Sequence, residues 1–227
     1  GITLRDLVNA IPLFAIKRGL LTVAKENKKN IFNGKIMEIE GLPDLKLEQA
    51  FELTDATAER SCAGSTILLS NKTVKEYLKS NICLLEKMIE SNYEDAKSIS
   101  RRISDMKTWL KKPELIQPDE NASYEEIIEI NLSKVTQPIV ACPNDPDNVK
   151  EIKDVENTKI DEVFIGSCMT NIGHYRAAAK VLEGIEKLNA KLWICPPTKM
   201  DEETLKTEGY YKIFEKCGAR LELPGCS

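Results

Sequence analysis

The chain has 227 residues, of which 42% are hydrophobic and 30% charged, and it carries a formal net charge of −4. This is an ordinary globular balance, long enough to bury the core of one large domain or two small ones. The acidic balance argues against a nucleic-acid binder that works by bulk positive charge. No apolar run in the sequence is long enough to cross a bilayer, so no membrane partner is expected.

The first half of the chain shows mixed helical and strand patterns. Thr3 and Asp6 resemble a helix start, and Pro12 is expected to bend or end that helix. The further elements expected here, in chain order, are a strand over 34–40, a short helix over 45–51, a short buried strand over 66–69, and long helices over 72–90 and 93–111.

The second half has a more regular pattern. Residues 111–123 hold two prolines and several polar residues, which indicates a connection between subdomains over 1–122 and 123–227. Beyond it the expected elements are strands over 127–130, 162–166, 191–195 and 219–223, and helices over 172–188 and 201–217, the latter with a break near Gly209. This alternation predicts an α/β fold with parallel or mixed sheets flanked by helices.

Cysteine usage limits the chemistry. The seven cysteines are odd in number and irregular in spacing, which favours reduced thiols and a cytoplasmic protein over a disulfide framework. No Cys-x-x-Cys pair occurs, so a self-contained zinc ribbon or thioredoxin motif is excluded. Any metal site must therefore draw its ligands from distant positions, or from sequence outside the chain.

Two cysteines follow predicted strands. Cys168 comes after Gly166 and Ser167 at the end of one strand and near the start of the next helix, where the helix dipole favours a thiolate. The carboxyl ends of parallel strands are also where ligands bind. A metal ligand or nucleophile and a small buried turn residue are equally compatible with that position. Cys226 follows a second such strand and would share the crevice, although taken alone it reads as an incidental cysteine.

The other candidate functional residues also have simpler structural interpretations. Glu59 lies among small residues in the segment 54–64, and partial burial would suit it to acid–base work, but a solvated glutamate is the simpler interpretation. His174, the only histidine, is expected to pack at a helix start. A run of basic residues on the helix over 93–111 predicts a solvated face, with an RNA or partner surface as the minority interpretation; these residues are Lys97, Arg101, Arg102, Lys107, Lys111 and Lys112.

The segment 166–171, Gly-Ser-Cys-Met-Thr-Asn, resembles the cluster-binding turn of the aconitase family of iron–sulfur hydro-lyases. The methionine before Thr-Asn is similar to the bacterial B-type branch of that family. Further similar segments, which extend the resemblance over essentially the whole chain, lie at 2–7, 38–45, 143–147, 196–201, 218–220 and 224–227.

The resemblance implies α/β/α layers and a [4Fe-4S] cluster held by three cysteines. Cys168 corresponds to the first ligand and Cys226 to the second, while the third would lie beyond Ser227. Glu59 resembles a catalytic glutamate beside the cluster and substrate, and Asp55 is expected to line the substrate site. Residues 1–122 would belong to a first subdomain of the aconitase core, and residues 123–227 to a second that carries the cluster cysteines and is incomplete at its C-terminus.

The implied activity is the interconversion of citrate and isocitrate through cis-aconitate, a step of the tricarboxylic acid cycle. The chain lacks an initiator methionine, so we expect an internal fragment that needs the remaining domains of its polypeptide, holds the cluster poorly by itself and is inactive alone. Three alternatives stay open. They are dehydration of 2-methylisocitrate or isopropylmalate, a regulatory RNA-binding role of the cluster-free form, and a purely structural subdomain with incidental cysteines.

Overall fold

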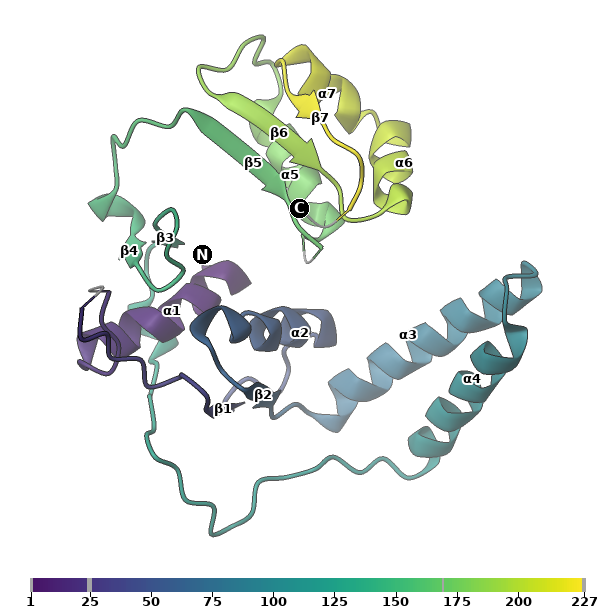
Figure 1. Cartoon of the computed structure of the whole chain (residues 1–227). Coiled ribbons are helices and arrows are strands. Elements are labelled where there is room, and N and C mark those ends of the chain that lie inside the picture. The colour runs from purple at the N-terminus through teal and green to yellow at the C-terminus, as the bar shows by residue number, and fades with distance from the viewer. Residues whose placement is uncertain (1, 24–25, 169, 226–227) are drawn as a thin grey trace. The chain divides into compact units, whose positions relative to one another are not determined.

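The computed structural model describes residues 2–23, 26–168 and 170–225, which form two compact units, Gly1–Glu156 and Asn157–Ser227 (Figure 1). The α/β expectation is confirmed, since both units combine short sheets with flanking helices. The subdomain division at residues 122 and 123 stays a prediction for the longer protein. Within this chain, Val135, Ile139 and Val149 pack with Ala10 in the core of the first unit.

Helix α1 (Leu4–Lys17) begins as the sequence predicts. The carboxylate of Asp6 accepts hydrogen bonds from the backbone N–H of Thr3 at 2.7 Å and from its hydroxyl at 2.8 Å. The expected end of this helix at Pro12 is wrong, because Pro12 lies inside a helix that continues to Lys17. Proline removes the donor that would bond the carbonyl of Val8, and the side chain of Arg60 donates to that carbonyl instead, at 3.4 Å.

Among the described residues, the rest of the first unit contains two small sheets and six further helical segments, three of which are 3-10 helices. Strands β1 (Ile36–Ile39) and β2 (Gly64–Ile67) pair in parallel, and β3 (Ile139–Ala141) and β4 (Val149–Glu151) pair antiparallel. The helical elements are α2 (Leu47–Asp55), the 3-10 helix η1 (Ala58–Arg60), α3 (Asn71–Glu90) and α4 (Ala96–Lys111), and short 3-10 turns follow at Leu132–Lys134 and Ile152–Asp154. None of the described helices is long and apolar enough to span a membrane.

The expected strand over 127–130 is wrong. Ile128 and Ile130 pack against two different apolar clusters, but this segment belongs to no strand and Ile127 is exposed. The apolar pattern therefore reports partly covered side chains on a segment outside the sheets. The strands β3 and β4 were not expected from the sequence, because each is only three residues long.

The second unit follows the predicted alternation of strands and helices. Its sheet has the order β5–β6–β7, with all pairs parallel, from β5 (Glu162–Gly166), β6 (Lys191–Cys195) and β7 (Arg220–Leu221). Helices α5 (Ile172–Leu182), α6 (Lys199–Thr207) and α7 (Tyr210–Lys216) share one apolar core with the strands. The break near Gly209 is confirmed, since its φ of 84° separates α6 from α7, whereas α5 ends six residues before the expected residue 188.

Candidate functional site

The turn that carries Cys168 begins where β5 ends, and its backbone is tightly constrained. A side-chain carbon at Gly166 would lie 2.5 Å from the ring of Phe164 and 3.0 Å from Cβ of Cys195, so only glycine fits without displacement. Ser167 has a φ of 135°, a conformation that costs energy for any residue but glycine. Cys168 follows and is exposed. Strained backbone of this kind clusters at ligand-binding turns.

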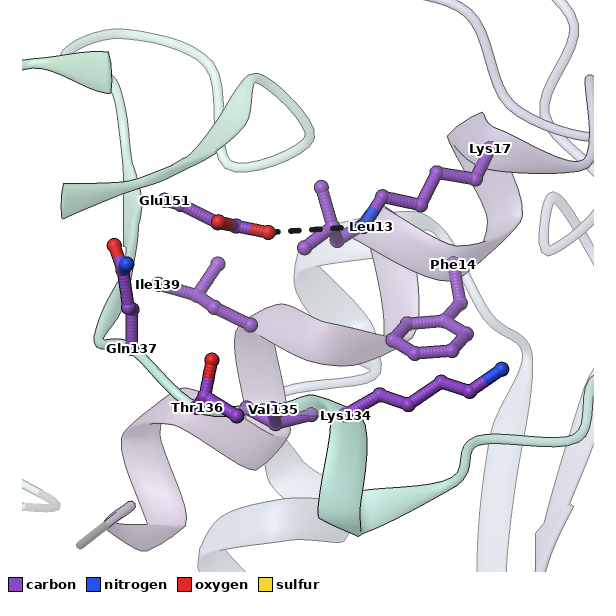
Figure 2. A pocket seen from close by; sticks show the side chains of 9 residues that line it. All are labelled: Leu13, Phe14, Lys17, Lys134, Val135, Thr136, Gln137, Ile139 and Glu151. Atoms are coloured by element: carbon purple, nitrogen blue, oxygen red, sulfur yellow. Dashed lines mark ion pairs between the residues drawn. The ribbon is translucent and has the colours of Figure 1, made fainter. Parts of the chain in front are cut away.

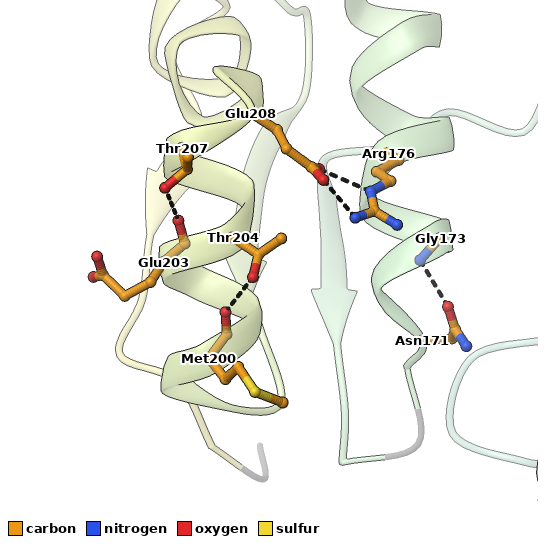
Figure 3. A network of polar contacts seen from close by, with 8 residues as sticks. All are labelled: Asn171, Gly173, Arg176, Met200, Glu203, Thr204, Thr207 and Glu208. Atoms are coloured by element: carbon orange, nitrogen blue, oxygen red, sulfur yellow. Dashed lines mark hydrogen bonds and ion pairs between the residues drawn. The ribbon is translucent and has the colours of Figure 1, made fainter. Parts of the chain in front are cut away.

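Hydrogen bonds fix this turn to the helix that follows it. The hydroxyl of Thr170 donates to the carbonyl of Gly166 at 2.9 Å, and the N–H of Thr170 donates to the carbonyl of Ser167 at 3.0 Å. Asn171 caps α5, because its side-chain oxygen accepts from the N–H of Gly173 at 2.7 Å (Figure 3). Cys168 is thus held just before a capped helix N-terminus, as the sequence predicts.

An ion pair joins the two helices nearest this turn. Arg176 on α5 donates to both carboxylate oxygens of Glu208, at 2.8 and 2.6 Å (Figure 3). Glu208 directly follows the last residue of α6. Two parallel bonds between a guanidinium and a carboxylate fix orientation as well as distance. The pair therefore joins α5 to the end of α6.

The carboxyl end of β6 contacts the segment that leads to Cys226. The thiol of Cys195, the last residue of β6, donates to the carbonyl of Leu223 at 3.3 Å. One residue further, the carbonyl of Pro196 accepts from the N–H of Gly225 at 3.0 Å. Cys195 is also the register partner of Gly166. The segments that precede the two predicted cluster cysteines therefore lie against the same strand end, although Cys226 itself lies outside the described residues.

Tyr175 supports this strand end from within the core. Its side chain is fully buried, and its hydroxyl donates to the carbonyl of Cys195 at 2.7 Å. Burial raises the pKa of Tyr175 to about 12, and the nearby Cys195 adds to the increase, while a hydrogen bond with Thr170 opposes it. The hydroxyl therefore stays protonated, and remains a donor, at any pH at which the protein works.

Asp55 and Glu59 belong to the first unit and Cys168 to the second. Asp55 is the last residue of α2, Glu59 lies in η1, and both side chains are exposed. The partial burial expected for Glu59 is therefore not provided by the described residues of its own unit. An exposed carboxylate in a short 3-10 turn is still open to a ligand or to another domain.

Sequence reasoning missed Arg60, the neighbour of Glu59. It is only 3% exposed, and it donates to the carbonyl of Ala56 at 3.0 Å as well as to that of Val8. Burial lowers the pKa of Arg60, and the nearby carboxylate of Asp147 acts against that decrease. The one available signal was Pro12, which implies an unpaired carbonyl four residues earlier. Arg60 fixes the backbone from which Glu59 projects.

A small pocket in the first unit lies apart from these residues (Figure 2). It is bordered by Phe14, Ile139 and an ion pair between Lys17 and Glu151 at 3.8 Å. Among the described residues, neither Asp55, Glu59 nor Cys168 lines it. It is therefore no part of the predicted site.

Within residues 2–23, 26–168 and 170–225, no three His, Cys, Asp or Glu side chains are grouped closely enough to hold a metal ion. The donor that these residues do present, the exposed thiol of Cys168, is the soft ligand type that iron–sulfur clusters require. The donor set thus fits one share of a cluster site whose other ligands come from elsewhere. The second unit is an α/β unit that presents a thiol at the ligand-binding edge of a parallel sheet.

Comparison with known proteins identifies the family. The model of the aconitase family (aconitate hydratase) matches residues 19–227, and the chain belongs to this family. It is 61% identical over 227 residues to aconitate hydratase B of Synechocystis sp., and 59% identical over 228 residues to aconitate hydratase B of Escherichia coli; each alignment covers 100% of this chain and 26% of the relative. The resemblance to the B-type branch is thereby confirmed, and the chain spans about a quarter of the length of these relatives.

More distant relatives match only part of the chain. The methanogen homoaconitase large subunit of Methanocaldococcus jannaschii is 41% identical over 119 residues, which are 52% of this chain and 28% of that protein. The 3-isopropylmalate dehydratase large subunit of Lachnoclostridium phytofermentans is 41% identical over 127 residues, which are 55% of this chain and 30% of that protein.

Proposed function

We propose that the protein to which this chain belongs is an aconitate hydratase, a hydro-lyase that interconverts citrate and isocitrate through cis-aconitate. The observation that carries this proposal is the 61% identity to aconitate hydratase B over the whole chain. The match covers both units, and therefore also the turn at Cys168.

The cofactor in this proposal is a [4Fe-4S] cluster, with Cys168 and Cys226 as two of its three protein ligands and the third beyond Ser227. When bound, such a cluster supplies an open iron that acts as a Lewis acid on the substrate hydroxyl. Two features support this ligand set. Cys168 is exposed before the capped N-terminus of α5, and the chain up to Gly225 lies against the end of β6, next to the strand that carries Cys168.

Glu59 is proposed as the residue that serves acid–base chemistry beside the substrate, with Asp55 lining the same site. Their exposure supports this role, since both carboxylates are open to a substrate bound among the remaining domains. Arg60 holds η1 in place through Ala56 and Val8, so the position of Glu59 does not depend on its own side-chain contacts.

The 227-residue chain alone is expected to bind a cluster weakly and to turn over nothing, because one thiolate ligand is missing. Thiolate ligands also need a reducing compartment, which fits a cytoplasmic protein.

Related substrates make up the second candidate function. The chain is 41% identical to a 3-isopropylmalate dehydratase large subunit, a hydro-lyase with a different substrate. Dehydration of 2-methylisocitrate belongs to the same class of reaction. That match covers 55% of the chain, whereas the match to aconitate hydratase B covers all of it, which favours citrate and isocitrate. RNA binding stays a prediction. The exposed Arg101 and Arg102 on α4 share that helix with the acidic Asp105.

The test uses the full-length protein that contains this chain, purified without oxygen. We expect bound iron and sulfide, and formation of cis-aconitate from citrate and from isocitrate that is faster than dehydration of 2-methylisocitrate or 3-isopropylmalate. Cys168→Ala and Cys226→Ala should each abolish cluster binding. Cys83→Ala removes an exposed cysteine of the first unit, and this variant should still bind the cluster. A protein that binds no iron, or that prefers 3-isopropylmalate, would contradict the proposal.

A further inference from the structure

We infer that Cys195 is a positioning residue for the cluster ligands, whose thiol holds the segment before Cys226 beside the turn that carries Cys168. This inference rests on the proposed cluster function, because its consequence is the spacing of two ligands. Cys195 is not offered as a ligand itself. It is 5% exposed, and its sulfur is already engaged with the backbone.

The segment before Cys226 is bonded to the end of β6. The thiol of Cys195 donates to the carbonyl of Leu223 at 3.3 Å, and the carbonyl of Gly225 lies 3.8 Å from the same sulfur. Backbone bonds lie on either side of this contact, from Glu222 to the carbonyl of Ile194 at 2.8 Å and from Gly225 to the carbonyl of Pro196 at 3.0 Å. After β7 ends at Leu221, Arg220 pairs with the carboxylate of Glu222, and among the described residues the thiol is the one side chain that donates to backbone carbonyls of 222–225.

The turn that carries Cys168 follows β5, on the opposite side of β6 from the segment before Cys226. Cys195 is the register partner of Gly166, and its Cβ would lie 3.0 Å from any side-chain carbon placed there. The chain at Gly166 therefore leaves no room for a side chain against Cys195, two residues before Cys168. Tyr175 fixes the carbonyl of Cys195 from within the core at 2.7 Å. One buried residue thereby touches both ligand-bearing segments and the helix that follows the first of them.

The spacing of the two segments matters for the binding of a cluster. A cluster that takes thiolates from two separate segments needs those segments at a fixed spacing, and groups that orient metal ligands commonly change metal affinity by about 10- to 100-fold when they are lost. A thiol suits this place because it is small enough to face Gly166, carries no charge into the core and still supplies a donor. Alanine would fit the same space but leave the carbonyl of Leu223 without this bond.

The matched control lies in the same unit. Cys217 in the turn after α7 is 3% exposed, and its thiol donates to the carbonyl of Phe214 at 3.2 Å. It shares burial and hydrogen-bond type with Cys195, but its thiol bonds to a carbonyl of α7 and not to the segment before Cys226. A general loss of packing or of a thiol hydrogen bond should therefore affect Cys195→Ala and Cys217→Ala alike, while a positioning role should separate them.

The experiment compares Cys195→Ala, Cys195→Ser and Cys217→Ala in the full-length protein. Two readouts are used: the rate at which iron and visible absorbance are lost in air, and amide hydrogen exchange of residues 222, 223 and 225 in the cluster-free protein. We expect Cys195→Ala to lose its cluster about tenfold faster than wild type and to exchange these amides faster. Cys195→Ser, which restores a donor, should recover most of both effects, and Cys217→Ala should stay within about twofold of wild type.

Equal behaviour of Cys195→Ala and Cys217→Ala in both readouts would overturn the inference. If Cys195→Ala does not fold, Cys195→Val replaces it, because it fills the space without supplying a donor; wild-type rates in that variant would equally overturn the inference. A wild-type protein that contains no iron and sulfide would instead refute the proposed function, and the ligand-positioning role with it. If the wild-type protein contains the cluster but substitution of Cys195 changes neither readout, this inference alone is refuted and the proposed function stands.

Discussion

The guanidinium of Arg60 donates a hydrogen bond to the carbonyl oxygen of Val8 over 3.4 Å, and this is the carbonyl that Pro12 leaves without its helical donor. The contact joins the middle of α1 to the turn that carries Glu59, 52 positions away in the chain. A proline inside the helix and a buried arginine beside a candidate catalytic residue are therefore parts of one arrangement.

This arrangement predicts an energetic coupling between the two positions. Arg60→Met should lower the free energy of unfolding of the first unit by about 2–4 kcal/mol, because it leaves two carbonyls unpaired and the buried carboxylate of Asp147 less compensated. Pro12→Ala restores a backbone donor to Val8, so the double variant should recover about 1 kcal/mol of that loss. Urea unfolding followed by Trp109 fluorescence, in a Trp193→Phe background, measures the cycle. Additive effects would show that Pro12 and Arg60 act independently. Arg101→Met, a change of an exposed arginine, is the control and should change the free energy of unfolding by no more than about 0.5 kcal/mol.

Asp6 predicts a pH dependence of the same unit. Burial acts to raise the pKa of Asp6, but hydrogen bonds from the N–H groups of Thr3 and Ile139 and from the hydroxyl of Thr3 outweigh it, so the pKa lies below its ordinary value. A lowered folded-state pKa contributes stability above the unfolded value of about 4, and that stability is lost as pH falls through the folded value. Asp6→Asn should therefore cost about 2 kcal/mol at pH 7 and markedly less near pH 3.

The comparison of variant with wild type at each pH isolates Asp6 from the other carboxylates. Asp105→Asn, an exposed change on α4, is the control and should give a small offset of about 0.5 kcal/mol or less that does not depend on pH. An Asp6→Asn cost that stays constant between pH 7 and pH 3 would contradict the assigned bonds.

Gly166→Ala tests the close approach of β5 to β6. The added methyl group would lie 2.5 Å from the ring of Phe164 and 3.0 Å from Cβ of Cys195, and the second of these neighbours is fixed in the sheet. We expect a loss of about 1–3 kcal/mol in the second unit. Trp193 fluorescence during urea unfolding, in a Trp109→Phe background, reports it. Gly64→Ala in β2 has open space at its Cβ position and should be tolerated; equal effects of the two variants would refute the packing argument.

Ser167 predicts that glycine is more stable than alanine at its position. Its φ of 135° is accessible to glycine but strained for serine. Ser167→Gly and Ser167→Ala both remove the hydroxyl, so the difference between them isolates the backbone. We expect the glycine variant to be more stable than the alanine variant by about 1 kcal/mol, again by Trp193 fluorescence. An alanine variant of equal or greater stability would show that the turn stores no strain.

Cysteine exposure predicts an order of chemical modification. Cys83 and Cys168 are exposed, whereas Cys195 and Cys217 are buried. Brief treatment of the 227-residue chain with iodoacetamide should modify the first pair and spare the second, as read by peptide mass spectrometry. In the cluster-loaded full-length protein Cys168 should become protected while Cys83 stays reactive. Modification of Cys168 at the same rate with and without the cluster would argue against its role as a ligand.

Much of the second unit was predictable, because β5, β6 and the helices are long enough to show their periodicity within one segment, whereas β7 has only two residues. The strands at 162–166 and 191–195 coincide with β5 and β6, and Gly209 separates two helices as expected. The first unit was harder. The apolar alternation at 127–130 belongs to a segment outside the sheets, and β3 and β4 are too short to show a pattern. Local periodicity reports which side chains are covered, not whether the backbone beside them is paired.

By itself, the sequence determined the candidate chemistry: a Gly-Ser-Cys turn between a strand and a helix, a second cysteine after another strand, and segments similar to the aconitase family along the whole chain. Only the tertiary structure decided that Cys195 contacts the segments that precede Cys168 and Cys226, and that Arg60 supplies the donor that Pro12 withholds. The physical reason is that turn and cap geometry depends on neighbours in the chain, which a sequence displays. Hydrogen bonds between residues some 30 to 50 positions apart exist only once the chain has folded them together.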